Sequence, residues 1–472
     1  MADGENTSGI ESIVKEFYAI IKEIWHVLAI LLFIYLIWHF NLINGLLFLI
    51  GLVILGRVAW IFWIHYIQQD FISGIDFALL EIVPPRDVLR SPKAMELFIT
   101  NALYHMSNKG GKEEYWQGAV WFWFSLEIAS IEGQVHFYIR TPTRVQGLIE
   151  TQIYAQYPQS QVKVAEDYTL AVDEISPESA WNGWGCEFGL DKPEAYPIRT
   201  YVDFGLDKDP KEEFKVDPIS PVIEFFGSLQ KGEQMWLQII VTPSKKTYRT
   251  HGKWFATHDW VEQARVEVKK LLKDYTSIKG KGVILGADAR VEVRVPAFLD
   301  NTVKAMNLKI TKIGFDTGIR VFYAAKKEAF NMSNRRNVRL IFRQYAKPDS
   351  NQLNRINSTQ ADAYSGIFGL SSKKIMILAN RMLNEYRERA FFHLPLRHHV
   401  FSKHTIVWPL ESIISASVFV TPFFLPYFHH KTFVLNVEEL ATLWHFPGQI
   451  LQVPTLERIE SKEASPPTNL PI

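Results

Sequence analysis

Residues 24–56 read IWHVLAILLFIYLIWHFNLINGLLFLIGLVILG, a run of 33 residues without a single Asp, Glu, Lys or Arg. A stretch this long and apolar is typical of a segment that lies in a bilayer, since one spanning helix needs about 20 apolar residues. Two amides and a glycine at positions 41–45 are typical of a turn. The sequence therefore predicts a two-helix transmembrane hairpin over residues 24–67, with helices near 25–40 and 46–67.

The flanks of this hairpin predict its orientation. Lys15 and Lys22 precede it, and Arg86, Arg90 and Lys93 follow it, whereas the turn between the helices has no basic residue. Because Lys and Arg accumulate on the cytoplasmic side of a membrane, we expect both termini to face the cytoplasm. The chain is then a multi-pass protein of the cell (inner, cytoplasmic) membrane, with its soluble domains in the cytoplasm.

The apolar run has other interpretations. An acidic N-terminus and the length of the run argue against a cleaved signal peptide. A buried hydrophobic hairpin of a soluble domain stays open. Arg57 would lie near mid-depth in the second helix, at a cost of a few kcal/mol, so it either snorkels to the interface or pairs with another helix. Cys186 is the only cysteine, which agrees with a reducing compartment.

Hydrophobic periodicity in the soluble remainder predicts an α+β fold. Residues 121–129 and 134–139 alternate apolar and polar side chains around a Glu132-Gly133 turn, which predicts a β-hairpin. Apolar residues at three- and four-residue spacing then predict a helix that starts near Thr143. Residues 161–165 are predicted to form a third strand. This order is typical of a split β-α-β domain, which is ferredoxin-like, with helices on one face of a sheet.

A second unit follows the same plan. Its predicted elements are strands at 234–241, 310–315 and 319–325 and helices at 259–275, 297–306 and 337–345. We therefore expect two ferredoxin-like domains, with the chain divided as follows: a cytoplasmic N-terminal segment 1–23, the hairpin 24–67, a linker with an amphipathic helix 68–116, the first α+β domain 117–232, the second α+β domain 233–347, a basic and aromatic region 348–446, and a Pro-rich extended tail 447–472.

The sequence lacks the usual motifs of catalysis. It has no Walker A loop, no Gly-x-Gly-x-x-Gly after a strand and no Gly-x-Ser-x-Gly elbow. Seven histidines crowd the C-terminal region without a His-Glu-x-x-His motif or a nearby thiolate, so a basic aromatic surface is favoured over a metal site. No His lies near Cys186 in sequence to activate it. We expect no enzymatic activity, no cofactor and no bound metal.

A basic block is the strongest signal in the soluble part. Residues 326–403 carry a net charge of +10, which leaves −9 for the rest of a chain whose total is +1. Such a block could contact nucleic-acid phosphates, anionic lipid head groups or the acidic remainder of the chain, or it could be an ordinary solvated surface. The candidate contacts, four of them at helical spacing, are Arg335, Arg336, Arg339, Arg343, Lys373, Lys374 and Arg381.

Two passages carry a resemblance to a known family. Residues 124–140 read FSLEIASIEGQVHFYIR, and 149–158 read IETQIYAQYP. The second passage is TFVLNVEELATLWHFP at 432–447, followed by PPTNLP at 466–471. Together they resemble an uncharacterised membrane-protein family of candidate-phyla bacteria over most of residues 70–472. In many relatives these segments stand directly before a P-loop motor of the type IV secretion coupling class (TraG/TraD-like).

The resemblance implies a function. The longer relatives continue into the motor where this sequence ends, at Ile472, so a separate P-loop ATPase is the implied partner. We expect a non-enzymatic membrane module that docks this DNA-translocating ATPase, with DNA and further copies of itself as additional partners. The alternative is a structural envelope scaffold that binds membrane proteins or anionic lipid without DNA. The candidate docking residues for the partner are Phe433, Leu440, Trp444 and Phe446.

Overall fold

The computed structural model describes residues 25, 28–36, 38–39, 42–85, 90–104, 110–207, 216–244, 259–279, 297–359, 372–393 and 430–448. They belong to two units, residues 1–67 and residues 68–472. The predicted segment 1–23 and residues 449–472 of the predicted tail lie outside the described residues.

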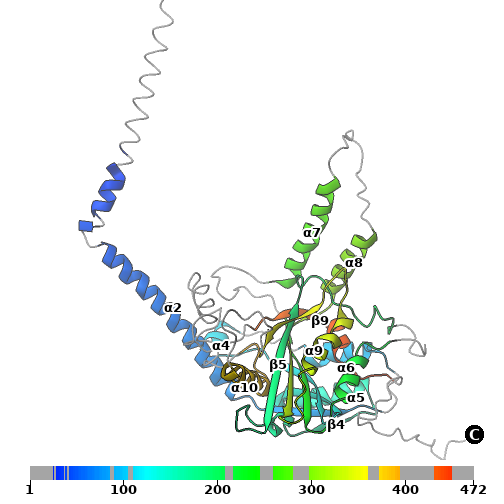
Figure 1. Ribbon diagram of the computed structural model, residues 1–472. Coiled ribbons are helices and arrows are strands. Elements are labelled where there is room, and N and C mark those ends of the chain that lie inside the picture. Colours follow the sequence, from blue (N-terminus) through cyan, green and yellow to red (C-terminus); the bar gives the residue numbers. More distant parts are fainter. Residues whose placement is uncertain are drawn as a thin grey trace, which may run out of the picture. The chain divides into compact units, whose positions relative to one another are not determined.

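The described residues of the apolar N-terminal run are helical, but they do not give a hairpin of two spanning helices. Helix α2 (Leu42–Ser73) contains one stretch, Asn44–Ser73, that is long and apolar enough to cross a membrane (Figure 1). The described part of the predicted turn, residues 42–45, is helical, so the hairpin prediction is wrong. A glycine costs a helix only about 1 kcal/mol, and an apolar segment gains by keeping every backbone hydrogen bond internal.

The second unit is built on one antiparallel sheet of nine strands. Along the sheet the order is β4-β1-β3-β2-β6-β7-β5-β8, and β9 pairs with the N-terminal half of β7. The strands are β1 (Phe77–Val83), β2 (Phe124–Ile131), β3 (Gln134–Pro142), β4 (Gln161–Val164), β5 (Trp181–Leu190), β6 (Glu233–Pro243), β7 (Gly314–Lys326), β8 (Leu353–Ser358) and β9 (Phe433–Asn436).

The predicted division into domains 117–232 and 233–347 is therefore not seen. Strand β6 begins the second predicted domain, yet it pairs with β2 on one side and with β7 on the other. The α+β class and the β2–β3 hairpin are confirmed, whereas a ferredoxin-like fold is not. Pairing between distant strands carries no local sequence signal, which is why one sheet was read as two domains.

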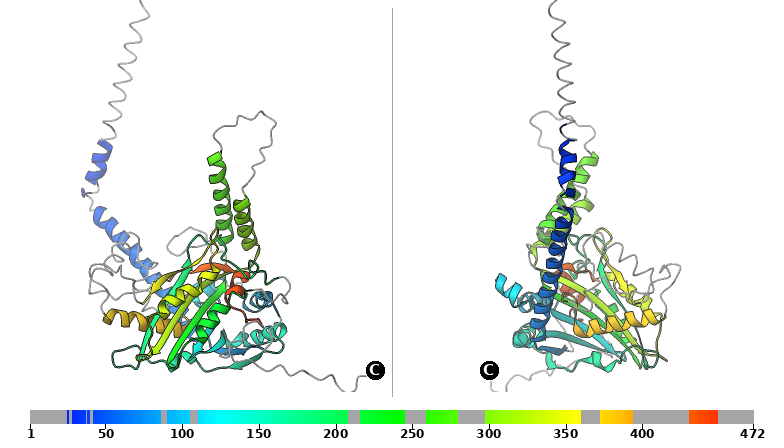
Figure 2. Two further views of the ribbon diagram at one scale, coloured as in Figure 1. Left: turned by 45° about the vertical axis from the view of Figure 1, so that its right-hand side comes forward. Right: turned by 90° about the vertical axis from the view of Figure 1, so that its left-hand side faces the viewer.

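Helices cover both faces of this sheet (Figures 1 and 2). The helices of the second unit are α3 (Lys93–Phe98), the π-helix η1 (Ile99–Leu103), α4 (Gly111–Trp116), α5 (Gln146–Gln156), α6 (Ser220–Gly227), α7 (Trp260–Lys279), α8 (Ala297–Thr311), α9 (Asn334–Ile341), α10 (Ser372–Glu388) and α13 (Val437–Leu443), with 3-10 turns η2 (Thr143–Val145), η3 (Tyr168–Ala171) and η4 (Arg343–Tyr345).

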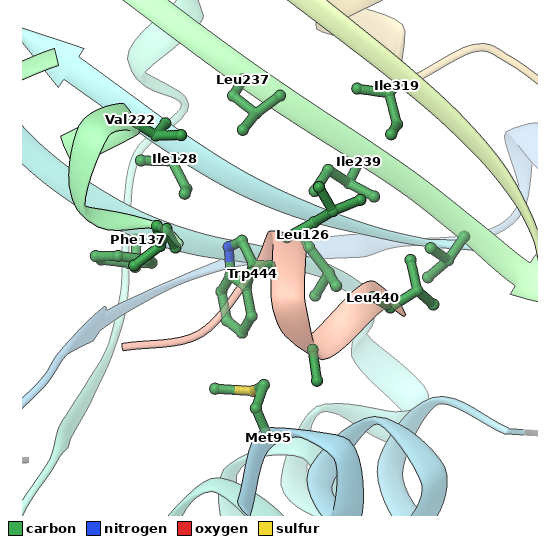
Figure 3. Packing of buried hydrophobic residues seen from close by; sticks show 14 of the residues in the cluster. Met95, Leu126, Ile128, Phe137, Val222, Leu237, Ile239, Ile319, Leu440 and Trp444 are labelled. Atoms are coloured by element: carbon green, nitrogen blue, oxygen red, sulfur yellow. The ribbon is translucent and has the colours of Figure 1, made fainter. Parts of the chain in front are cut away.

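The first face of the sheet carries the main hydrophobic core. Alternate residues of the central strands, such as Leu126, Leu237 and Ile319, point to this face and pack under α3, η1, α5, α6, α9 and α13. Trp444 lies at its centre, fully buried, with its ring at 5.9 Å from that of Phe137 (Figure 3). Removing a buried aromatic side chain of this kind typically costs about 3–5 kcal/mol.

The second face lies under α10 and η3, and glycines make this close approach possible. A Cβ atom at Gly185 of β5 would overlap the Met382 sulfur of α10, and one at Gly318 of β7 would come within 2.5 Å of the Phe391 ring. Because glycines weaken a strand signal, β5 is not among the predicted strands. Residues 201–207, between β5 and α6, are a series of turns.

Helices α7 and α8 lie side by side and extend away from the sheet (Figures 1 and 2). At the base of α8, Lys309 forms a fully buried ion pair with Glu439 of α13, with a 3.0 Å separation. Lys312 contacts Glu438 of α13 at 2.7 Å and Glu96 of α3 at 2.6 Å. These ion pairs join α8 to two helices of the main core.

Candidate anion-binding site

Helix α9 presents the four predicted arginines because its other side is apolar. Val338 and Ile341 are buried against the first face of the sheet. Arg336, Arg339 and Arg343 are exposed and Arg335 is half-buried. The three- and four-residue spacing that predicted a basic helix face is confirmed, although the last arginine lies in the turn η4.

Arginines from three elements meet at one hollow of about 500 Å³. Strand β8, at the edge of the sheet, contributes Arg355 to its wall. The remaining described lining comes from α9 and η4, so that five of the six described lining residues are arginines: Arg335, Arg336, Arg339, Leu340, Arg343 and Arg355. A second hollow of about 150 Å³ shares Arg339 and Arg343.

The arginines of α9 and η4 have no acidic partner among the described residues. No described carboxylate forms an ion pair with Arg335, Arg336, Arg339 or Arg343. Lys347, a few residues further on, has its ammonium at 2.7 Å from the Asp203 carboxylate. Like charges gathered without counter-charges repel one another, and a bound anion would relieve that repulsion. Chemically, the hollow can bind phosphate or carboxylate groups through bidentate guanidinium contacts.

The other candidate contacts of the predicted basic block lie on another helix, α10. Arg381 lies on α10, which packs on the second face of the sheet, and its Nε donates to Glu385 Oε1 at 3.0 Å. Lys373 and Lys374 lie in the first turn of the same helix. Sequence reasoning missed Arg355, because it lies in the basic and aromatic region 348–446, where no strand was predicted.

The four candidate docking residues lie in the core of the chain itself. Phe433, Leu440, Trp444 and Phe446 are at most 2% exposed. Strand β9 and helix α13, which matches the predicted helix at 437–443, place them there. The prediction that they form a partner surface is corrected accordingly, because side chains that complete a chain's own core are not available to a partner in the folded state.

A row of buried polar residues crosses the second face of the sheet. Each pairs in register with the next across neighbouring strands, in the order Tyr138, Glu127, Gln238, Arg320, Glu187 and Asn357. Glu127, Gln238, Arg320 and Glu187 are completely buried. Periodicity could not have found this row, because its members come from six different strands.

Arg389 neutralises one end of this row. Its Nε and Nη2 atoms donate to the two carboxylate oxygens of Glu127 at 3.0 and 3.2 Å, and its Nη1 also contacts Asp167. Burial raises the pKa of Glu127, but the attraction of Arg389 outweighs burial and holds that pKa below its ordinary value.

The other end of the row could supply metal ligands. One ligand atom each of Glu187, Glu385 and His430 lie within 4.8 Å of one another. However, Arg320 Nη2 already lies 2.7 Å from Glu187 Oε1 and 3.5 Å from Glu385 Oε2. Because that guanidinium neutralises the same carboxylates and would repel a cation, we interpret the cluster as an ion-pair network. Cys186 is also buried, and burial raises the pKa of its thiol, which keeps it unreactive.

His430 should make folding stability depend on alkaline pH. Burial lowers the pKa of His430, but the carboxylates of Glu187 and Glu385 outweigh this and raise it to about 9. Arg320 and Arg381 are the cations beside those carboxylates. Because the folded pKa lies above the unfolded value, the stabilisation is complete below the unfolded pKa and is lost as pH rises through about 9.

We expect up to about 3 kcal/mol of stability to be lost over that range. The measurement is urea unfolding of the full chain and of His430→Gln between about pH 6 and 10. The difference between the two proteins should shrink toward high pH, which isolates this histidine from other titrating groups. A difference that stays constant across the range would contradict the assignment.

Comparison with known proteins agrees with an uncharacterised domain. The family model described as "Domain of unknown function (DUF8128)" matches residues 79–457, which include the arginine hollow and the buried row. No curated protein matches the chain.

Proposed function

The chain belongs to the DUF8128 family, and we propose that it is a membrane-anchored, non-enzymatic module that holds nucleic acid by its phosphates beside a separate DNA-translocating ATPase. The single observation that carries the proposal is the hollow lined by five arginines, four of them without an acidic partner among the described residues. Arginine is the side chain best suited to phosphate, because its planar fork donates two parallel hydrogen bonds.

The anchoring part of the proposal is supported by α2. Its apolar residues from 44 to 56 are exposed in the described structure, and an exposed apolar surface of that size is typical of a segment that lies in lipid. The ATPase is supported by the resemblance of residues 124–158 and 432–471 to segments that precede a coupling-type motor. Docking of that ATPase would have to use surfaces other than the buried Trp444 region.

A second candidate ligand is anionic lipid. It is favoured by the presence of a membrane-spanning candidate helix in the same chain as the basic hollow, since basic clusters near a bilayer attract acidic head groups. In this case the chain would be an envelope scaffold without a link to DNA.

Measuring DNA binding and lipid binding with the same protein distinguishes the two candidate ligands. The full chain in detergent is titrated against a fluorescent 30-base-pair DNA duplex of about 10 nM, and against vesicles of neutral lipid with and without about 30% phosphatidylglycerol. We expect duplexes of unrelated sequence to bind with affinities within about threefold of one another, because phosphate contacts carry no sequence information. Binding to anionic vesicles without binding to duplex would replace the DNA proposal by the scaffold.

The ATPase part has its own experiment. The full chain is captured from native membranes after mild crosslinking, and the bound proteins are identified by mass spectrometry. We expect to recover an ATPase that contains a P-loop. This ATPase should be lost when the crosslinker is omitted and the salt concentration is raised. Recovery of envelope proteins alone would contradict this part and leave the nucleic-acid site to be judged separately.

A further inference from the structure

Three elements contribute to the wall of the arginine hollow. Helix α9 and the turn η4 supply four arginines to it, and strand β8 supplies Arg355. A ligand within it would therefore be held by a helix and an edge strand at once. A flat basic surface, by contrast, contacts a polymer only along one side. The contribution of Arg355 from β8 distinguishes the hollow from an ordinary basic helix face.

Size and lining restrict what the hollow can hold. Its volume of about 500 Å³ is in the range of pockets that bind small molecules, about 300–1,000 Å³. Among the described residues, the lining consists of the five arginines and Leu340 and includes no aromatic ring. Bases and sugars are usually recognised by stacking or by mixed polar contacts. The lining therefore fits the charged oxygens of a ligand rather than a ring.

Charge restricts the ligand further. Four of the five lining arginines have no acidic partner among the described residues, so at least four uncompensated positive charges surround one small volume. One phosphate group, with three terminal oxygens, is satisfied by about two arginines in bidentate geometry, which would leave the others uncompensated. A chain of adjacent phosphates carries several charges within a few ångströms and can engage guanidinium groups on both walls.

We propose that the hollow between α9 and β8 binds a compact polyphosphate, a chain of phosphates joined by anhydride bonds, and that this ligand competes there with nucleic acid. The inference rests on the proposed anion-binding function of the same arginines and names a second ligand class for them. A cellular polyphosphate would then control how firmly the module holds its nucleic acid.

Calorimetry of the full chain in detergent tests this inference. The probes are tripolyphosphate and orthophosphate, without divalent cations, at about 0.1 M salt. Tripolyphosphate is expected to bind at least about 100-fold more tightly than orthophosphate, since it can meet about four arginines rather than two. It should also displace a bound DNA duplex at concentrations near its own dissociation constant. Equal affinities for the two phosphates would overturn the inference.

Arg355→Gln separates the two ligands. This substitution is expected to lower tripolyphosphate affinity at least about tenfold. It should change duplex affinity less than about threefold, because the duplex phosphates mainly contact the exposed arginines of α9. Lys347→Gln, whose lysine lies outside the lining, is the matched control and should change neither. If Arg355→Gln fails to fold, Arg339→Gln, at an exposed position, must show the loss of tripolyphosphate affinity.

The outcomes distinguish this inference from the proposed function. Duplex binding without tripolyphosphate binding would contradict the polyphosphate inference and leave the proposed function supported. Tripolyphosphate binding without duplex binding would contradict the proposed function and leave polyphosphate binding supported. Full tripolyphosphate affinity in both Arg355→Gln and Arg339→Gln would show that the ligand binds elsewhere, which overturns the assignment to this hollow.

Discussion

Replacing Arg389 by methionine is expected to destabilise the folded chain by about 3–5 kcal/mol, the cost of leaving a buried charge without its partner. Arg389 is 1% exposed and Glu127 is completely buried. The bidentate pair between them is the main compensation for the Glu127 carboxylate, which also accepts bonds from Ser125 at 2.6 Å and Tyr168 at 2.7 Å. Methionine keeps much of the volume and removes the charge.

Backbone conformation makes methionine a fair replacement. Arg389 has a φ of 50°, in the left-handed region that disfavours side chains with a Cβ atom. Methionine retains this strain, whereas glycine would relieve it and mask part of the loss. The measured change therefore reports the lost ion pair.

Two controls make this prediction specific. Lys347→Met removes an ion pair with Asp203 that is about one-third exposed on both sides, and it should cost less than about 1 kcal/mol. The double variant Glu127→Gln/Arg389→Met should recover part of the loss, since Glu127 no longer leaves a fully buried charge uncompensated and only the half-buried Asp167 has lost its partner. Urea unfolding followed by tryptophan fluorescence measures all four proteins. Equal losses from Arg389→Met and Lys347→Met would contradict the buried pair.

The quadruple substitution of Arg335, Arg336, Arg339 and Arg343 by glutamine is expected to weaken duplex binding on the order of 10³-fold at about 0.1 M salt. Each arginine that contacts a phosphate releases about one condensed counterion, and this release is worth somewhat less than tenfold in affinity at that salt. Glutamine keeps helix propensity and much of the side-chain length. The fold should therefore persist, which circular dichroism checks.

A charge-matched variant controls for general electrostatics. Arg265, Lys269, Lys270 and Lys273 on α7 are also exposed, and their replacement by glutamine removes the same total charge. This control should lose less than about tenfold in affinity, because distant surface charges are screened beyond about 10 Å. Equal losses in both quadruple variants would mean that net charge alone governs binding.

Local sequence patterns predicted the elements well where packing is local. Alternation predicted the β2–β3 hairpin, and the apolar spacing of Met95, Phe98, Ile99 and Leu103 predicted a helical segment whose four side chains are completely buried. The arginine spacing of α9 was found in the same way. In each case the signal lies within about a dozen consecutive residues.

Long-range pairing accounts for what was missed. Strand β9 and Trp444 complete a core whose other members lie up to about 350 residues earlier, and their aromatic composition looked like a docking surface. Strand β5 carries glycines because α10 packs closely upon it, which weakens its local signal. The apolar run was read as two helices because Asn and Gly often make turns, but α2 accommodates them.

The most direct test of the account is the salt dependence of duplex affinity. The logarithm of the association constant of the full chain, plotted against the logarithm of salt concentration, should fall with a slope set by the phosphates that its arginines neutralise. The quadruple arginine variant should have a slope shallower by about 3 to 4 than the unsubstituted chain. Parallel lines for the two proteins would contradict phosphate binding by the arginine hollow.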